Sequence, residues 1–230
     1  MKKLFLKSLF AAACCLIFPA GMSAQFSGSG SGTKDDPYRI FNADQLNQVR
    51  NFVGKTDVYF SLEADIDMTQ WIAENNPSQG WQPIGKDSGF RGNFNGNGHI
   101  ISNLWIKRPS TDYIGMFGKI DDNAEILNLK LENAEYVGND YVGGIVGYCY
   151  NANSITSCEF NGKISGNDYI GGICGYNFND GYDTTISDCF TDSHIKGRDY
   201  IGGICGYNKV YNNYFYNVIH FKWLFIIYIK

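Results

Sequence analysis

The sequence predicts an all-β protein, a right-handed parallel β-helix (β-solenoid) with a short capping helix at its N-terminal end. The main observation is the segment 169–177, which recurs almost letter for letter at 200–208, with looser copies that begin at Tyr141 and Tyr113. The tyrosines that begin these copies are 28, 28 and 31 residues apart. Self-similarity at such a period is the signature of a repeat architecture.

A second periodic segment supports the same fold. Tetrapeptides of the form Ile-x-x-Leu or Ile-x-x-Cys begin at Ile101, Ile126, Ile155 and Ile186. With a third piece such as 162–164 or 194–196, each repeat supplies three short strands, which is one turn of a parallel β-helix. One coil cannot bury its apolar side alone, so stacked neighbours make the core continuous.

Composition agrees with many short strands and tight turns. The 230 residues include 27 Gly, 16 Tyr and 16 Phe, and only 18% are charged, below the usual quarter. The net charge of −4 gives no electrostatic support to a nucleic-acid partner.

Residues 1–24 are interpreted as a secretory signal peptide. Three lysines precede an apolar segment at 9–19, and Met22-Ser23-Ala24 offers a small-residue cleavage site before Gln25. Its removal takes away the three lysines and leaves a mature net charge of about −7. We therefore expect an exported protein, on the cell surface or extracellular, without a membrane span after signal removal. Acylation at Cys14 or Cys15 is a less favoured alternative.

The following segments give the expected organisation from the N-terminus. Gly and Ser alternate over 27–32, which predicts a flexible lead-in at 25–34. Residues 35–208 are expected to form the β-helix, with 107–208 as its regular part. A strand at 38–40 precedes a helix that begins at Asn42, because Gln45 stands at capping-box spacing and Gly54 suits the C-terminal end. This helix should cover the open end of the solenoid.

Between the helix and the regular part, we expect a strand at 58–68 and a polar loop at 69–89. Two Asn-Gly turns follow within 90–99, and then a strand at 100–106. The tail, 209–230, lacks Gly, Ser, Thr, Asp, Glu and Ala. We interpret it as a frameshifted end of a truncated protein, with an apolar C-terminal strand as the alternative.

The five cysteines after residue 24 are predicted to be free core thiols. Cys174 and Cys205 stand where looser repeats have Val146 and Phe117, and Cys158 stands where the preceding repeat has Leu129. Exchange with these residues marks buried apolar positions. A disulfide between stacked neighbours stays open, since equivalent residues lie about 4.8 Å apart.

No catalytic, cofactor-binding or metal-binding residue is predicted. The sequence has no His-Glu-x-x-His and no Gly-x-Ser-x-Gly motif. His99, His194 and His220 are isolated, and a nucleophilic Cys158 with a histidine partner is disfavoured by its Leu equivalent. Asp65 and Asp67 alternate along a strand, as solvated strand residues or as the paired carboxylates of a sugar enzyme.

Two ladders of equivalent side chains are the strongest candidates for function. An aspartate precedes the tyrosine of each copy, at Asp112, Asp140, Asp168 and Asp199. We expect the carboxylates to accept backbone amides, with a calcium site as the alternative. Two tyrosine rows flank the Gly-rich strand, Tyr113, Tyr141, Tyr169 and Tyr200 against Tyr148, Tyr176 and Tyr207.

The tyrosine rows have two interpretations, packed aromatics or an exposed platform for glycans. Their members lie seven residues apart along each repeat. An odd separation places them on opposite faces of a regular strand, unless the glycines bend it.

The Gly-Gly-Ile-[Val/Cys]-Gly-Tyr core resembles the GLUG motif of bacterial surface proteins. Residues 30–38, 64–68 and 90–101 are similar to N-terminal modules of the same exported proteins, and the likeness covers about residues 29–208. GLUG repeats occur in adhesin-like proteins and beside the peptidase unit of bacterial IgA-specific metalloendopeptidases. The resemblance implies an exported β-helix and carries no catalytic residue onto this chain.

The expected function is therefore non-catalytic display. A rigid rod would present repeated side chains to a glycan or to a host or neighbour-cell protein, as part of a larger cell-surface protein. Two rival hypotheses are an accessory N-terminal region of a secreted metallopeptidase and a β-helix polysaccharide-active enzyme.

Overall fold

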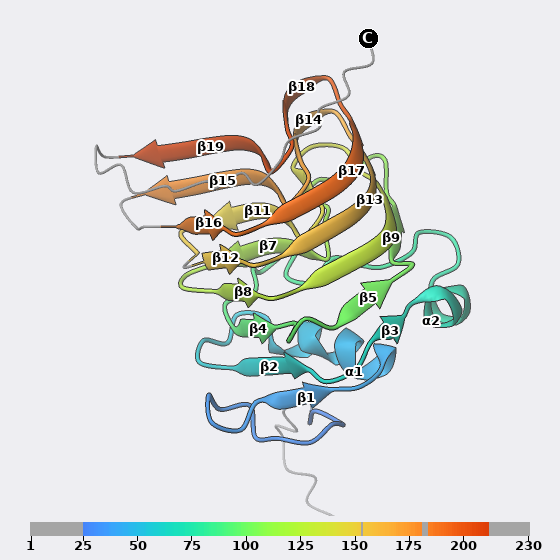
Figure 1. The fold of residues 1–230 in the computed structure, drawn as a ribbon, viewed down its shortest axis with the longest axis vertical. Coiled ribbons are helices and arrows are strands. Elements are labelled where there is room, and N and C mark those ends of the chain that lie inside the picture. Colours follow the sequence, from blue (N-terminus) through green and yellow to red (C-terminus); the bar gives the residue numbers. More distant parts are fainter. Residues whose placement is uncertain (1–24, 153, 181–183, 212–230) are drawn as a thin grey trace, which may run out of the picture.

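The computed structural model describes residues 25–152, 154–180 and 184–211. This part of the chain winds into a solenoid of four parallel sheets, whose coils stack from β1 at the bottom to β19 at the top (Figure 1). All pairings between its named strands are parallel. The all-β solenoid predicted from the repeat period is thus confirmed.

Sheet A begins each coil, and its strands follow one another along the axis in chain order. Alternate side chains point inward, so that Phe94, Ile126 and Ile155 are buried in one column. The strands are β1 (Tyr38–Ile40), β2 (Tyr59–Leu62), β4 (Asn93–Asn95), β8 (Glu125–Leu127), β12 (Ser154–Thr156) and β16 (Thr185–Ser187).

Sheet B comes next in each coil and has the longest strands. Its order is β3-β5-β9-β13-β17, and β6 also pairs with β9. The bounds are β3 (Ile66–Asp67), β5 (Ile100–Ser102), β6 (Trp105–Lys107), β9 (Lys130–Val137), β13 (Glu159–Ser165) and β17 (Phe190–Lys196).

The Gly-rich repeat forms two strands where the sequence predicts one. The chain bends at the paired glycines. In the repeat at 169–177, the strand of sheet D therefore ends at Gly171, and the strand of sheet C begins at Cys174. Four strands per regular coil therefore replace the expected three. Sheet D contains β10 (Val142–Gly143), β14 (Asp168–Gly171) and β18 (Asp199–Gly202), and sheet C contains β7 (Phe117–Asp121), β11 (Val146–Tyr150), β15 (Cys174–Asp180) and β19 (Cys205–Tyr211).

One predicted equivalence is wrong. Ile101 does not align with Ile126, because Ile101 pairs with Leu131 in sheet B, whereas Ile126 pairs with Phe94 in sheet A. An asparagine with positive φ follows both strands, Asn103 at 59° and Asn128 at 51°. The same short pattern thus serves two different corners, and the tetrapeptide alone does not tell them apart.

The N-terminal end of the core is closed, as the sequence predicts. Helix α1 (Ala43–Gln48) begins at Asn42, whose side chain accepts a hydrogen bond from the amide of Gln45, and continues as the 3-10 helix η1 (Val49–Phe52). Leu46 and Val49 are fully buried. Both helices lie behind β1 and β2 in Figure 1.

The predicted flexible lead-in is packed instead. Phe26 is buried, and its ring contacts Phe52 and Phe60 with centroid distances of 6.3 and 6.1 Å. The Ser27 amide donates to Gln48 Oε1, and the Arg39 amide donates to the Ser29 carbonyl. Its Gly-Ser composition indicates flexibility, but one apolar anchor and these backbone bonds fix the segment across the end of the first coil.

The region 58–89 differs from its expected single strand and loop. The strand is divided into β2 and β3, which belong to different sheets. The polar loop contains helix α2 (Thr69–Asn75) and the fully buried Trp81, whose indole N–H donates to the Met116 carbonyl at 3.1 Å. Trp81 fills the core where the early coils lack the later sheets.

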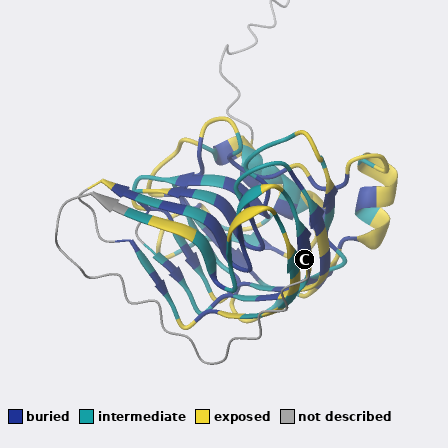
Figure 2. Cartoon of the chain, turned by 90° about the horizontal axis from the view of Figure 1, so that it is seen from above, coloured by how far each residue is buried: buried dark blue, intermediate teal, exposed yellow. Residues whose placement is uncertain are grey.

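The interior of the described coils is mainly apolar, with Ser61, Asn177, Asn179 and Thr184 as its buried polar residues. The buried residues form the inner faces of the sheets (Figure 2). All five cysteines of the interior are free thiols, and all except Cys205 are buried. Cys174 and Cys205 are direct partners on β15 and β19. A strand spacing of about 4.8 Å exceeds the usual Cβ–Cβ distance of about 3.8 Å in a disulfide, so a bridge here would require backbone movement.

Candidate functional site

The aspartate ladder lies at the corner between sheets B and D and binds backbone amides. Asp112 accepts the amide N–H of Asp140 at 3.2 Å, and Asp140 accepts that of Asp168 at 3.2 Å. These two carboxylates thus cap the equivalent aspartate one coil further on. The expected amide capping is confirmed for Asp112 and Asp140, although the amide comes from the next coil rather than from the same turn.

The residues that precede these aspartates complete the corner. Asn139 donates to Asp112 at 2.7 Å, and Asn167 donates to Asn139. One coil further, Arg198 binds Asp168 with Nε at 3.0 Å and Nη2 at 2.6 Å. The described residues contain no group of three or more histidine, cysteine or acidic side chains placed to hold a metal ion. The calcium alternative therefore gains no support from geometry.

The first tyrosine row forms a continuous stack. Ring centroids are 5.1, 4.9 and 4.8 Å apart, at interplanar angles of 10° or less, along Tyr113, Tyr141, Tyr169 and Tyr200. Their backbones have φ values between 56° and 61°, which is unusual for a residue with a large side chain. The repeat of this costly conformation shows that the stack is built into every coil.

The second tyrosine row lies edge-on against the first, because the glycines bend the strand, the exception that the sequence left open to opposite faces. Tyr176 stacks on Tyr148 at 5.3 Å and meets Tyr169 edge to face at 5.2 Å. The bend at the paired glycines turns sheet C back toward the tyrosines of sheet D. Burial and neighbouring tyrosines raise the pKa of the Tyr148 hydroxyl, so it stays protonated at neutral pH.

Mutual stacking decides what these rows can bind. The faces of the inner rings are occupied by other tyrosines, and Lys119 covers Tyr113 at 4.2 Å from the ring centroid. Sugars stack on free aromatic faces, and the ladder offers few of them. The rows are therefore mainly structural, which favours the packed interpretation over a glycan platform.

Asp65 and Asp67 hold loops together rather than facing each other as a catalytic pair. Asp65 accepts the Ile100 amide at 2.9 Å and contacts His99 Nδ1 at 3.1 Å. Asp67 accepts the amide and the hydroxyl of Thr69 at 2.8 and 2.6 Å. These hydrogen bonds lower the pKa of both carboxyl groups, the opposite of what a general acid needs.

The remaining nucleophile candidate is also explained by packing. The Cys158 thiol is buried and donates to the Ile126 carbonyl at 3.5 Å. Burial raises its pKa, and a reactive cysteine needs a lowered one. His194 lies on the outer face of β17, and His220 falls outside the described residues.

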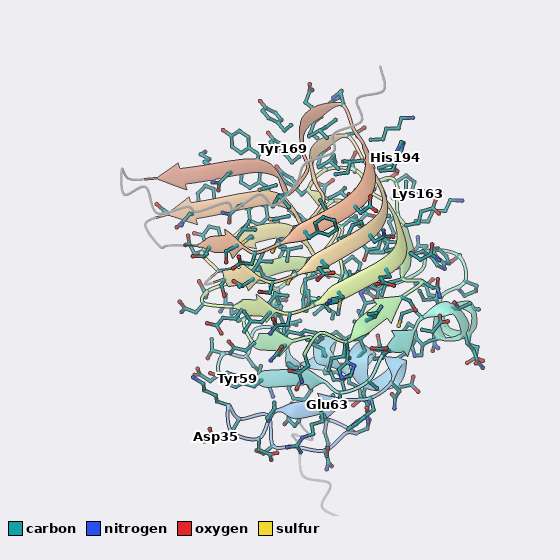
Figure 3. All side chains as sticks on the ribbon, in the orientation of Figure 1. Asp35, Tyr59, Glu63, Lys163, Tyr169 and His194 are labelled. Carbon is teal, nitrogen blue, oxygen red and sulfur yellow. The ribbon has the colours of Figure 1, made fainter. Side chains whose placement is uncertain are left out.

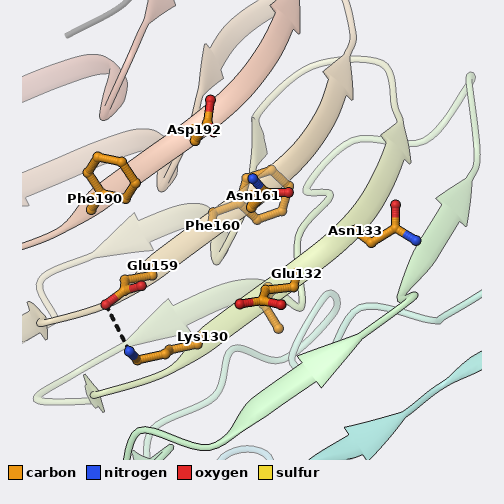
Figure 4. Close-up of a pocket in the computed structure, with 9 residues that line it drawn as sticks. Lys130, Glu132, Asn133, Glu159, Phe160, Asn161, Phe190 and Asp192 are labelled. Carbon is orange, nitrogen blue, oxygen red and sulfur yellow. Dashed lines mark ion pairs between the residues drawn. The ribbon is translucent and has the colours of Figure 1, made fainter. Parts of the chain in front are cut away.

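A polar cleft that sequence reasoning missed lies on the outer face of sheet B. It consists of two adjoining hollows that share Asn133, Asn161 and Asp192, and Figure 4 shows the first of them. The first is bounded by the ion pair of Lys130 and Glu159 at 3.1 Å, drawn as a dashed line in Figure 4. The second extends along the axis to Trp105 and Thr69.

The cleft is built from columns of strand residues in register. The column that pairs along β6, β9, β13 and β17 consists of Trp105, Glu135, Lys163 and His194. Lys163 and His194 point away from the solenoid in Figure 3. Unlike the tyrosine rows, this column has a different chemical group in every coil, and none of its four members forms an ion pair within the described residues.

A bulge shapes the middle of the cleft. The register of β9 and β13 shifts between Phe160 and Gly162, and Asn133 has a φ of 50°. Asn133 donates to Asn103, and Asn103 donates to Asp67 at 3.0 Å, so these amides are held in place. Asn161 is exposed and has no protein partner in the described structure. Bulges re-aim side chains locally, which strand patterns in a sequence do not reveal.

The charges of the cleft favour a neutral ligand. Its two hollows contain four carboxylates and two lysines, at Glu132, Glu135, Glu159, Asp192, Lys130 and Lys163. This excess of negative charge opposes an acidic polymer. Asparagine amides both donate and accept hydrogen bonds, which suits hydroxyl-rich ligands.

Comparisons with known proteins find two partial relatives by sequence. No family model matches the chain, so the GLUG resemblance stays a prediction. The chain is 37% identical over 157 residues to a candidate Gly-rich membrane protein of Evansella cellulosilytica, a match over 64% of this chain and 18% of that protein. It is 35% identical over 124 residues to halomucin of Haloquadratum walsbyi, over 52% of this chain and 1% of halomucin. The chain thus spans less than a fifth of either relative.

A solved structure shares the fold. The crystal structure of a candidate immunoglobulin A1 protease from Bacteroides ovatus superposes with a TM-score of 0.55 and 24% identity. The match covers 78% of this chain and 64% of that chain. At this identity the likeness concerns the solenoid architecture alone.

Proposed function

We propose that this chain is an exported, non-catalytic module of a larger, adhesin-like cell-surface protein, and that it binds a neutral glycan along the outer face of sheet B. The observation that carries the proposal is the cleft shared by β6, β9, β13 and β17. There the side chains differ from coil to coil and project to solvent, whereas the other repeated side chains bind their own copies.

Export and surface location are supported by several independent features. Residues 1–24 have the pattern of a secretory signal, and they lie outside the described residues. The matched relatives include a protein named for the membrane and a halomucin. Among the described residues, no helix is long and apolar enough to cross a bilayer.

The chemistry of the cleft suits a glycan. Asn133 and Asn161 offer amide groups that can bond sugar hydroxyls, and Trp105 lies at one end of the cleft with a half-buried ring. An aromatic wall with a few placed polar groups is the usual make-up of a ligand site. Neighbouring parallel strands lie about 4.8 Å apart, so a chain-like ligand can contact the different groups of several coils at once.

A catalytic role is not part of the proposal. The carboxylates outside the cleft that could form a pair, Asp65 and Asp67, have a lowered pKa and are engaged with amides and hydroxyls. Glu159 in the cleft is paired with Lys130. We therefore expect binding without cleavage of the glycan.

Affinity electrophoresis of the full chain in gels that contain neutral or acidic polysaccharides tests the proposal. We expect retardation by at least one neutral polymer, weakened about tenfold by Asn161→Ala, the loss of about one hydrogen bond in a desolvated contact. Lys196→Ala is the matched control, because Lys196 is equally exposed on β17 but does not line the cleft.

Three outcomes contradict the proposal. Retardation by acidic polymers alone would conflict with the charge of the cleft. Equal retardation of the wild type and Asn161→Ala would place the site elsewhere. Release of reducing ends from a bound polymer would show that the chain is an enzyme.

A further inference from the structure

The two ends of the described solenoid differ in how completely the apolar core is covered. At the N-terminal end, Phe26, α1 and η1 cover the first coil. At the other end, each of the four sheets ends at a strand of the last described coil, β16, β17, β18 or β19. Figure 1 shows these strands together at the top of the stack.

Equivalent residues show that this last coil is incompletely covered on three of its sides. On sheet B, Ile164 is buried, whereas its partner Ile195 is only partly buried. The same change occurs from Ile170 to Ile201 on sheet D and from Cys174 to Cys205 on sheet C. These side chains point into the core of a solenoid, and one more coil would cover them.

Polar and aromatic side chains at this end would also be paired by one more coil. Asn177 is 1% exposed and donates Nδ2 to Asn208 Oδ1 at 2.9 Å. Asn208, the acceptor in this bond, is exposed. Tyr200, which ends the first tyrosine stack, is 52% exposed and offers the ring face that every earlier member gives to the next tyrosine.

We propose that this end is a docking surface for a further β-solenoid coil of the same repeat, with its strands parallel to β16–β19. Such a coil would bury Ile195, Ile201 and Cys205, extend the Asn177–Asn208 series and stack a tyrosine on Tyr200. The interface would repeat the one that already joins every pair of regular coils, so its complementarity is known from within the molecule.

Strand direction excludes a second copy of this chain as the partner. Its N-terminal end is closed by Phe26 and the segment 27–33. If two C-terminal ends met with the same sheet faces inward, their strands would run antiparallel. Asn208 and Tyr200 would then not lie opposite an equivalent asparagine and tyrosine. A coil with the same chain direction avoids both problems.

The test inserts a second copy of residues 178–208 after Asn208 in the full chain, with valine in place of the inserted cysteines. The alkylation rate of Cys205 is then measured by mass spectrometry, with buried Cys174 as the internal reference. We expect Cys205 to react at least tenfold more slowly after insertion and the melting temperature to rise by several degrees. The matched control carries the same insertion with aspartate at the copies of Ile195, Ile201 and Ile204, which should leave Cys205 reactive.

Several outcomes overturn the proposal. One is equal reactivity of Cys205 with and without the insertion, and another is equal protection by the aspartate control. If wild-type Cys205 already reacts as slowly as Cys174, the end is covered, and this result decides the matter even if the insertion does not fold. Protection of wild-type Cys205 that grows with protein concentration, together with dimers in sedimentation, would replace the coil by a second copy.

Discussion

The two sides of the regular coils differ in whether their side chains are repeated from one coil to the next. On the side of sheets C and D, identical residues recur in each coil and bind one another, as in the stack of Tyr141, Tyr169 and Tyr200. On the outer face of sheet B, the column from Trp105 to His194 changes its chemistry at each coil. Repetition marks the residues that stabilise the solenoid, and the divergent surface is the one that we propose for ligand binding.

The largest effect is expected from the bend that brings the two tyrosine rows together. A Cβ at Gly171 would lie 2.0 Å from the carbonyl oxygen of Cys174 and 2.8 Å from the amide nitrogen of Gly206. Because both are backbone atoms, Gly171→Ala should lower the free energy of unfolding by about 3 kcal/mol. Urea denaturation measures this, and Gly98→Asn is the control, since Gly98 has a φ of 75° and open space around it. A loss below that of the control would contradict the role of the bend.

Removal of one ring tests the ladder itself. Tyr169 stacks between Tyr141 and Tyr200 and meets Tyr176 edge to face. Tyr169→Asn tolerates the φ of 61° and should cost about 2 kcal/mol, because several aromatic pairs are lost. Tyr169→Phe should stay within about 1 kcal/mol of wild type. Thermal melts of both variants distinguish ring packing from any need for the hydroxyl.

An interior tyrosine should behave differently from the ladder tyrosines. Tyr136 on β9 is fully buried, its hydroxyl has no hydrogen-bond partner among the described residues, and burial raises its pKa. Tyr136→Phe removes an unsatisfied polar group, so stability should stay the same or rise by up to about 1 kcal/mol. A clear loss of stability in urea would reveal a hydrogen bond that the described contacts do not contain.

The pH dependence of stability tests the role of the Asp67 carboxylate, which accepts a hydrogen bond from Asn103 of the cleft. Hydrogen bonds from Thr69 and then Asn103 lower the pKa of Asp67. A lowered pKa means that this stabilisation is present above the ordinary pKa and is lost as pH falls through the folded-state pKa. Asp67→Asn should therefore melt below wild type at pH 7, and the gap should close as pH falls below about 4. A gap that is independent of pH would show that charge is not involved.

The smallest change in stability is expected within the cleft. Asn161 is exposed and its side chain binds no described residue. Asn161→Ala should change the free energy of unfolding by less than about 0.5 kcal/mol, although it should weaken glycan binding. A destabilisation comparable to that of Tyr169→Asn would place Asn161 with the structural residues and remove the contrast between the two sides.

Prediction from sequence succeeded where the repeats have nearly identical residues. The period of the tyrosines located every regular coil, and the Asn42 to Gln45 spacing located α1. The prediction failed for Ile101 and Ile126, because the same short pattern occurs at two different corners of the coil. It also failed for the lead-in, because the buried Phe26 ring fixes a segment whose composition indicates flexibility. The candidate cleft on sheet B was missed because its residues share no motif.

The sequence alone determined that the chain coils, how long each coil is, and which apolar residues point inward. These follow from periodicity, since every coil must solve the same packing problem with its neighbour. Only the tertiary structure decided that the glycines divide one predicted strand into two, turning the tyrosine rows toward each other. It also placed Trp105, Asn161 and His194 in one cleft, because their proximity depends on register between coils, which no local pattern in the sequence encodes.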